Sequence, residues 1–191
     1  MKDDIVLVRP TLEQKEKALA YRKEHFMHGE KIIYGSELFD KTESYEEWLF
    51  GVTRNTSAET VSENWVVTDT FFAVRKNDDR IIGMIDLRHT LNEFLKDLGN
   101  CGYSVRPSER RKGYATEMLC QLLRVAEEAG LKELHISVEK GNKASTKVIQ
   151  KMAVYMNGVI LLKMKRQIFI KLYYNAWLIL RDHSLISGRS L

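Results

Sequence analysis

The stretch from Arg110 to Ala115 has the residue types that bind a phosphate or pyrophosphate group. It reads Arg-Arg-Lys-Gly-Tyr-Ala and leads into a run of helical periodicity over residues 116–129. The start of a helix leaves its first backbone N–H groups without intrahelical partners, and the peptide dipoles make that end electropositive. Basic residues before such a start, with a glycine that lets the backbone approach a ligand closely, are typical of a phosphate cradle. The alternative is an ordinary helix start beside solvated arginines.

Two well-known phosphate loops do not fit this stretch. No Gly-Lys-Ser/Thr closes it, as a P-loop requires, and the glycines do not follow the dinucleotide pattern Gly-x-Gly-x-x-Gly. The cradle therefore belongs to another class of site.

With its surroundings, the stretch resembles the acetyl-CoA signature Arg/Gln-x-x-Gly-x-Gly/Ala of the GCN5-related N-acetyltransferase (GNAT) family. Residues 102–107, Gly-Tyr-Ser-Val-Arg-Pro, precede it, and Asn-Lys-Ala-Ser at 142–145 follows the next predicted strand at 134–138. The order of strand, loop, helix, strand, Asn-x-x-Ser and helix is similar to the family throughout residues 80–151. Residues 65–94 also look like a bacterial branch of predicted acetyltransferases.

The resemblance implies that acetyl-CoA is the cosubstrate and that no metal takes part. The backbone of residues 111–116 would bind the pyrophosphate, and main-chain groups of Tyr103 and Val105 would pair with the pantetheine amides like an added strand. For Asn142 and Ser145, a structural role at the start of the following helix stays open beside cofactor contact. The implied cofactor-binding residues are Tyr103, Val105, Arg110, Arg111, Lys112, Gly113, Tyr114, Ala115, Thr116, Asn142 and Ser145.

Acetyl transfer from a thioester to an amine needs a neutral amine, a donor to the developing oxyanion and an acid for the leaving thiolate. Glu93 and His89 are the candidates that orient or deprotonate the amine, near the end of a core strand that also carries Asp86. Tyr155 is the candidate acid that the resemblance implies. His135 lies on the other splayed strand, where a lone histidine is more typical of a structural role.

The activity that the resemblance implies is N-acetyl transfer from acetyl-CoA to a primary amine acceptor, by direct transfer in a ternary complex. No cysteine stands where an acyl-enzyme would form, because Cys120 falls in the middle of the predicted helix. The alternative is a catalytically silent CoA-binding or interaction protein that uses the same cradle.

Composition sets the general class of the protein. The chain has 191 residues, 44% of them hydrophobic and 29% charged, as in an ordinary soluble globular domain. The two cysteines, Cys101 and Cys120, have no paired spacing, which argues against a disulfide or zinc framework and for a reducing compartment. A charged N-terminus and no uncharged run of about 18 residues predict a cytoplasmic protein without a membrane span. No nucleic acid partner is expected, and a homodimer stays open.

The elements that must position these residues predict an α+β domain. A strand at 5–9 is followed by a helix that Thr11 begins, Ser44 begins another helix, and strands at 71–75 and 81–87 form a hairpin. The resemblance implies a GNAT-like central sheet, mixed but mostly antiparallel and flanked by helices. That sheet splays where strands 101–105 and 134–138 part, and the pantetheine arm enters the gap.

The last forty residues depart from the family pattern, which divides the chain into an acetyltransferase domain at 1–151 and an atypical basic and apolar segment at 152–191. Residues 1–139 hold 25 of the 26 acidic residues, and the remaining 52 residues hold only Asp182. After Lys151 the resemblance implies Asn-Gly-Gly, whereas the sequence has Met-Ala-Val at 152–154. Loss of one base from AAT GGC GGT leaves ATG GCG GT, which encodes Met-Ala-Val.

We therefore hypothesise that residues beyond 151 are read out of frame, which puts the C-terminal strands of the family fold in doubt. The alternatives are a natural tail that packs as a helix on the domain, and a basic segment that contacts a membrane surface or nucleic acid. Sequencing the gene for an open frame that encodes Asn-Gly-Gly after Lys151 tests the hypothesis.

Overall fold

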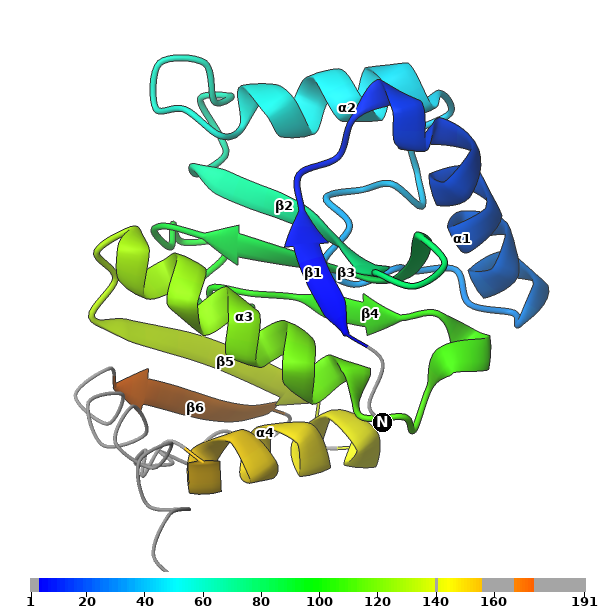
Figure 1. The fold of residues 1–191 in the computed structure, drawn as a ribbon. Coiled ribbons are helices and arrows are strands. Elements are labelled where there is room, and N and C mark those ends of the chain that lie inside the picture. The colour runs from blue at the N-terminus through cyan, green and yellow to red at the C-terminus, as the bar shows by residue number, and fades with distance from the viewer. Residues whose placement is uncertain (1–3, 140, 156–166, 174–191) are drawn as a thin grey trace, which may run out of the picture.

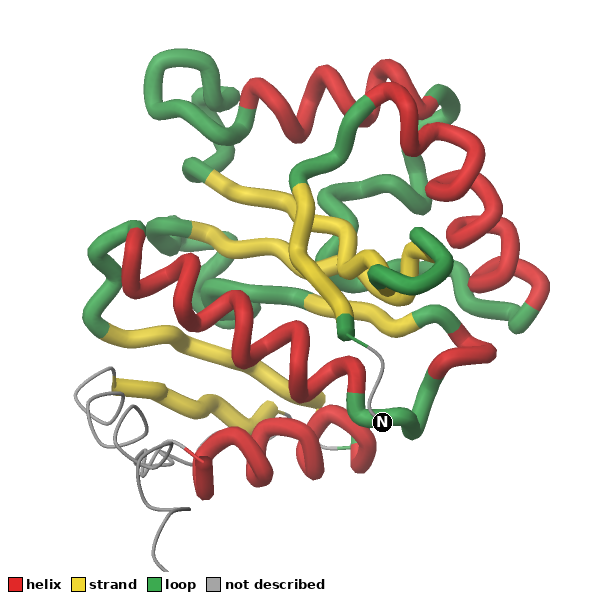
Figure 2. The backbone as a smooth tube through the Cα atoms, viewed as in Figure 1, coloured by secondary structure: helices red, strands yellow, loops and turns green. Residues whose placement is uncertain are grey.

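The computed structural model describes residues 4–139, 141–155 and 167–173, arranged as a central sheet between two layers of helices (Figures 1 and 2). The described elements, in chain order, are β1 (Ile5–Val8), a 3₁₀ turn (Leu12–Gln14), α1 (Lys15–Met27), α2 (Tyr45–Arg54), β2 (Thr68–Arg75), β3 (Arg80–Arg88), β4 (Tyr103–Val105), a second 3₁₀ turn (Pro107–Glu109), α3 (Tyr114–Glu128), β5 (Glu133–Glu139), α4 (Lys143–Tyr155) and β6 (Gln167–Tyr173).

Four strands form the first part of the sheet in the order β1-β2-β3-β4, and each neighbouring pair is antiparallel. The predicted hairpin is confirmed, because β2 pairs with β3 across the turn at residues 76–79. A register shift at Ala73 and Val74 leaves an extra residue on β3, which is the usual signature of a β-bulge. β2 and β3 are buried over almost their whole length, so helices must cover both faces of the sheet.

Two apolar clusters account for that burial. On one face, α1 and α2 pack over alternate sheet residues, with Tyr21, Phe39 and Trp48 at the centre. On the other face, α3 and α4 pack over the sheet, with Met118 and Leu122 fully buried. The predicted α+β architecture, an antiparallel sheet flanked by helices, is confirmed.

The sheet splays between β4 and β5, as expected from the family resemblance. The segment that leads into β4 contacts β5 through a bridge between Gly99 and Ile136, through hydrogen bonds of Asn100 with His135, and through a bond from the Ser137 hydroxyl to the Leu98 carbonyl. The Asn100 N–H lies 2.7 Å from the His135 carbonyl, and the His135 N–H lies 2.9 Å from the Asn100 side-chain oxygen. Beyond this clasp, β4 pairs only with β3, and β5 pairs only with β6.

Local sequence signals set the helix ends. The Ser44 hydroxyl accepts the Glu47 N–H at 2.9 Å, which confirms the predicted start of α2. Gly130, at φ +80°, ends α3, where the Leu131 N–H bonds to the Ala126 carbonyl in the pattern of a Schellman motif. α3 begins at Tyr114, two residues earlier than the periodicity predicts, because the left-handed Gly113 is its N-cap.

The C-terminal segment contributes one described strand. β6 pairs with all seven residues of β5, from Glu133 opposite Tyr173 to Glu139 opposite Gln167. Residues 167–173 therefore form a strand, not the helix expected for a natural tail that packs on the domain. The hypothesis of a frame slip and the division at residue 151 remain predictions, and most of 152–191 lies outside the described residues.

Candidate functional site

The loop before α3 has the backbone geometry of an anion site. Gly113 has φ +88°, and Arg111, although not a glycine, has φ +65°. Left-handed residues in such a turn make successive N–H groups converge on one point, and the positive end of the α3 dipole faces the same side. The conformation at Gly113 is one that L-residues rarely adopt, so the glycine is needed here for the backbone itself.

Two of the three basic side chains of this loop are held by carboxylates of the protein. Arg110 forms a two-pronged pair with Glu30, with one N···O distance of 2.7 Å. Lys112 contacts the buried Glu109 at 2.8 Å, and Arg75 and Arg80 share the same carboxylate. The exposed Arg111 has no ion pair among the described residues. The main chain, rather than a cluster of unpaired cations, is therefore the feature of this loop that suits an anion.

The main chain of β4 faces the splay at alternate residues. Gly102, Ser104 and Arg106 direct their backbone groups at β3, as the bonds from Asp86 N–H to the Gly102 carbonyl and from Arg106 N–H to the Ile82 carbonyl show. Because backbone groups alternate along a strand, those of Tyr103 and Val105 point to the other edge. The Val105 carbonyl already accepts a hydrogen bond from Arg110 Nε at 3.0 Å.

At the start of α4, the two polar residues of the Asn-x-x-Ser motif have protein partners. The Asn142 side-chain oxygen accepts the Ser145 N–H at 2.9 Å, so Asn142 caps the helix. The Ser145 hydroxyl bonds to the Tyr103 hydroxyl, which joins β4 to α4. Burial raises the pKa of Tyr103 to about 12, so this phenol keeps its proton at neutral pH.

Of the three predicted catalytic residues, Glu93 and His89 each pair with another residue. Glu93 has a side chain 93% exposed and pairs with Lys96, and that hydrogen bond lowers the pKa of Glu93. His89 directly follows β3, and its Nε2 lies 2.9 Å from an Asp69 carboxylate oxygen. The end of β3 and the start of α3 lie at opposite ends of the sheet (Figure 1). Tyr155 is the last residue of α4, and its side chain lies outside the described residues.

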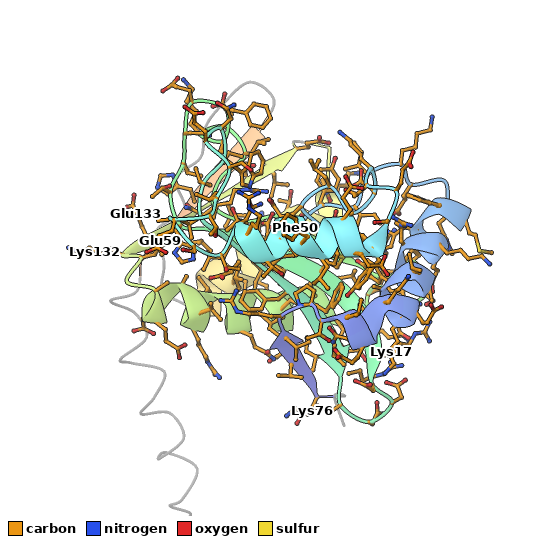
Figure 3. All side chains as sticks on the ribbon, turned by 90° about the horizontal axis from the view of Figure 1, so that it is seen from above. Lys17, Phe50, Glu59, Lys76, Lys132 and Glu133 are labelled. Carbon is orange, nitrogen blue, oxygen red and sulfur yellow. The ribbon has the colours of Figure 1, made fainter. Side chains whose placement is uncertain are left out.

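His89 and His135 line a shallow, open depression of about 540 Å³ near the Asn100 clasp. Its rim includes Lys132 and Glu133, which lie at the edge of the molecule (Figure 3). His135 Nε2 is 2.7 Å from the Glu133 carboxylate, in agreement with a structural role for this histidine. The depression is at the closed end of the splay.

A buried charged group that the sequence analysis missed lies beside the first residues of β4. Glu37, from the loop between α1 and α2, accepts the Trp65 indole N–H at 2.8 Å and lies 3.5 Å from the Arg88 guanidinium. Arg88 also pairs with the fully buried Asp86 at 2.6 Å. Asp86 and Arg88 at alternate positions of an apolar strand are a sequence signal of such a group, whereas nothing in the pattern around Glu37 indicates its burial.

Burial, followed by the nearby charge of Asp86, raises the pKa of Glu37 from its ordinary value of about 4.5 to about 8. The folded chain therefore binds more protons than the unfolded chain between these two pH values. We expect the free energy of unfolding to fall as pH rises from about 4.5 to about 8, by about 1.4 kcal/mol for each unit of pKa difference. Urea unfolding of the wild type and of Glu37→Gln across this range checks it. A variant with the wild-type slope would contradict the expectation.

The described residues show neither a helix that could cross a membrane nor a cluster of three or more potential metal-ligating side chains. The sequence matches the family model described as an acetyltransferase (GNAT) domain over residues 5–153. No curated protein matches the chain.

Solved structures with the same fold include several bacterial acetyltransferases. The ribosomal-protein-S5-alanine acetyltransferase from Vibrio fischeri has a TM-score of 0.62 and 16% identity, covering 93% of this chain and 96% of the other. An N-acetyltransferase from Staphylococcus aureus Mu50 has a TM-score of 0.58 and 17% identity, with 90% and 99% covered. Mutant forms of the spermidine/spermine N-acetyltransferase SpeG from Vibrio cholerae have a TM-score of 0.58 and 11% identity, with 94% and 98% covered.

Proposed function

The chain belongs to the GNAT acetyltransferase family, and we propose that it transfers an acetyl group from acetyl-CoA to a primary amine within a ternary complex. The observation that carries the proposal is the combination of the left-handed Gly113 at the α3 start with a strand, β4, whose free edge faces a splay. The first feature suits a pyrophosphate and the second suits an extended amide chain.

The residues present fit acetyl-CoA, which would supply the acetyl group as a reactive thioester. The N–H groups of the α3 start would hold the diphosphate, with Arg111 as the added positive charge. The backbone of Tyr103 and the N–H of Val105 would hold the pantetheine amides, because both face the splay. The Val105 carbonyl already accepts one hydrogen bond from Arg110, which leaves one lone pair for a ligand.

The cysteines support direct transfer over a covalent acyl-enzyme. Cys101 is buried, and this burial raises the pKa of its thiol, which keeps the nucleophilic thiolate scarce. Cys120 is in the middle of α3, with its sulfur 3.4 Å from that of Met152 in the core. Both cysteines of the chain are thus placed as packing residues.

We expect the purified chain to release free CoA from acetyl-CoA when a suitable amine is supplied. A panel of peptides with different N-terminal residues, polyamines and small primary amines, followed by thiol detection and mass spectrometry of the acceptor, tests this. Acetyl-CoA without amine is the control for hydrolysis.

The rival function is a silent CoA-binding protein, which the exposed position of Glu93 and the pairing of His89 with Asp69 favour. Such a protein would bind acetyl-CoA in calorimetry but would leave every acceptor unmodified. That pair of results would replace the enzymatic proposal by the rival.

A further inference from the structure

The loop between α1 and α2 holds Glu37 in a backbone conformation that costs free energy. Glu37 and Leu38 have φ +48° and +66°, consecutive left-handed residues without a glycine. Residues of this kind are uncommon and persist only where the surroundings require them. The side chain of Glu37 is 5% exposed, so the strained loop places a carboxyl group inside the protein.

The interior around Glu37 contains more negative than positive groups. Asp86 and Arg88 face it from β3, and Trp65 donates its indole N–H from the segment before β2. Cys101 lies beside Asp86 and Arg88, with its pKa raised by burial, so it does not titrate near neutrality. Two carboxyl groups and one guanidinium in a buried site favour the retention of one proton, and Glu37 shares a hydrogen bond with Asp86.

This group is attached directly to the start of β4. Asp86 Oδ1 accepts the Gly102 N–H at 2.5 Å, and the Asp86 N–H donates to the Gly102 carbonyl at 3.2 Å. Gly35, two residues before Glu37, is so close that a Cβ there would lie 2.3 Å from the Gly102 carbonyl oxygen. Figure 2 shows this loop running beside the strands. The loop, β3 and the start of β4 therefore form one tightly fitted unit.

Gly102 lies where the reacting end of a bound thioester would come. A chain anchored at Gly113 and lying along the free edge of β4 runs from Val105 back toward Gly102. Three residues of strand span roughly 10 Å. Movement of Gly102 would displace the next residue, Tyr103, whose backbone faces the splay.

We propose that Glu37 is a positioning residue of the acetyl-transfer site: its protonated carboxyl leaves Asp86 free to hold the Gly102 N–H, and loss of that proton loosens the start of β4. The inference rests on the proposed function, because it assigns β4 to the cosubstrate. In the charged state, Glu37 and Asp86 repel each other across a buried gap with only Arg88 between them. The Asp86 side chain then moves, its hydrogen bond to the Gly102 N–H is lost, and the backbone at the start of β4 shifts.

The test measures acetyl-CoA affinity by calorimetry at pH 6.5 and pH 9.5, so no acceptor is needed. Glu37→Gln imitates the protonated carboxyl, since its amide still donates to Asp86 and accepts from Trp65. We expect the wild type to bind more weakly at pH 9.5, by up to about tenfold for each pH unit above the pKa of Glu37. Glu37→Gln should bind equally well at both pH values. The exposed Glu43→Gln, in the same loop, is the matched control and should behave as the wild type.

Equal pH dependence in the wild type and Glu37→Gln would overturn the inference while leaving the proposed function standing. A folded Glu37→Gln that binds at neither pH, while the wild type binds, would also overturn it. A wild type that binds no acetyl-CoA at either pH would overturn both. If Glu37→Gln does not fold, hydrogen exchange of the Gly102 amide in the wild type decides: protection lost above pH 8 supports the role, and retained protection refutes it.

Discussion

Gly113→Val is expected to weaken acetyl-CoA binding by roughly hundredfold or more. The β-branched side chain strongly disfavours φ +88°, so the loop must change conformation and the N–H groups at the α3 start no longer converge. The loss of two hydrogen bonds to a charged phosphate, at about 1.5 kcal/mol each, corresponds to a factor of this size. Calorimetry with acetyl-CoA measures it directly.

Gly130→Val is the matched control, because Gly130 has φ +80° at the other end of the same helix and open space around its Cα. Both substitutions impose similar backbone strain on α3, so both are expected to lower stability. Only Gly113→Val should change the affinity for acetyl-CoA. Equal loss of affinity in both variants would mean that helix stability, rather than the loop, determines binding, and the assigned cradle would be wrong.

Arg88→Leu is expected to lower the free energy of unfolding by about 3–5 kcal/mol, because it leaves the buried carboxyl groups of Asp86 and Glu37 without their cation. The same guanidinium donates to the Gly99 carbonyl at 3.2 Å, so the segment leading to β4 also loses a contact. Urea unfolding at pH 7 gives the difference.

The comparison for this variant is Lys15→Ala, which breaks the exposed pair of Lys15 with Glu46. Because solvent screens that ion pair, the urea midpoint of Lys15→Ala should match that of the wild type. A small effect of Arg88→Leu, similar to that of Lys15→Ala, would show that water screens the charges around Glu37 despite their burial.

Much of the fold follows from short-range signals that act within a few residues. The Ser44 cap, the turn of the hairpin between β2 and β3, and Gly130 each specify a local conformation that the packing keeps. The splay could be predicted only from the family resemblance. The sequence of an apolar strand such as 134–138 does not indicate which strand it pairs with. Its closed end depends on the amide of Asn100, whose bonds join residues 35 positions apart.

The conformation of the loop before α3 follows from the sequence more directly than the surroundings of the candidate catalytic residues do. Gly113 carries its own conformational signal, whereas Glu93 and His89 offer only their residue type and their place near a strand end. In the structure, Glu93 forms an exposed ion pair with Lys96. His89 contacts Asp69 on β2. Glu37 was missed because its burial comes from a loop folding back on β3 and β4, a contact between distant segments that no local pattern encodes.

The clasp around Asn100 divides the hydrogen-bonded strands into two sets. Apart from that clasp, the main-chain ladders of the first four strands and of the β5–β6 pair are independent over the described residues. The β6 ladder is formed with β5 alone, whereas β5 and α4 share an apolar core with α3 and β3. The proposed cosubstrate-binding segments, β4 and the loop before α3, both precede β5 and β6 in the chain. Exchange of the last strand would therefore leave the sequence of these two segments unchanged.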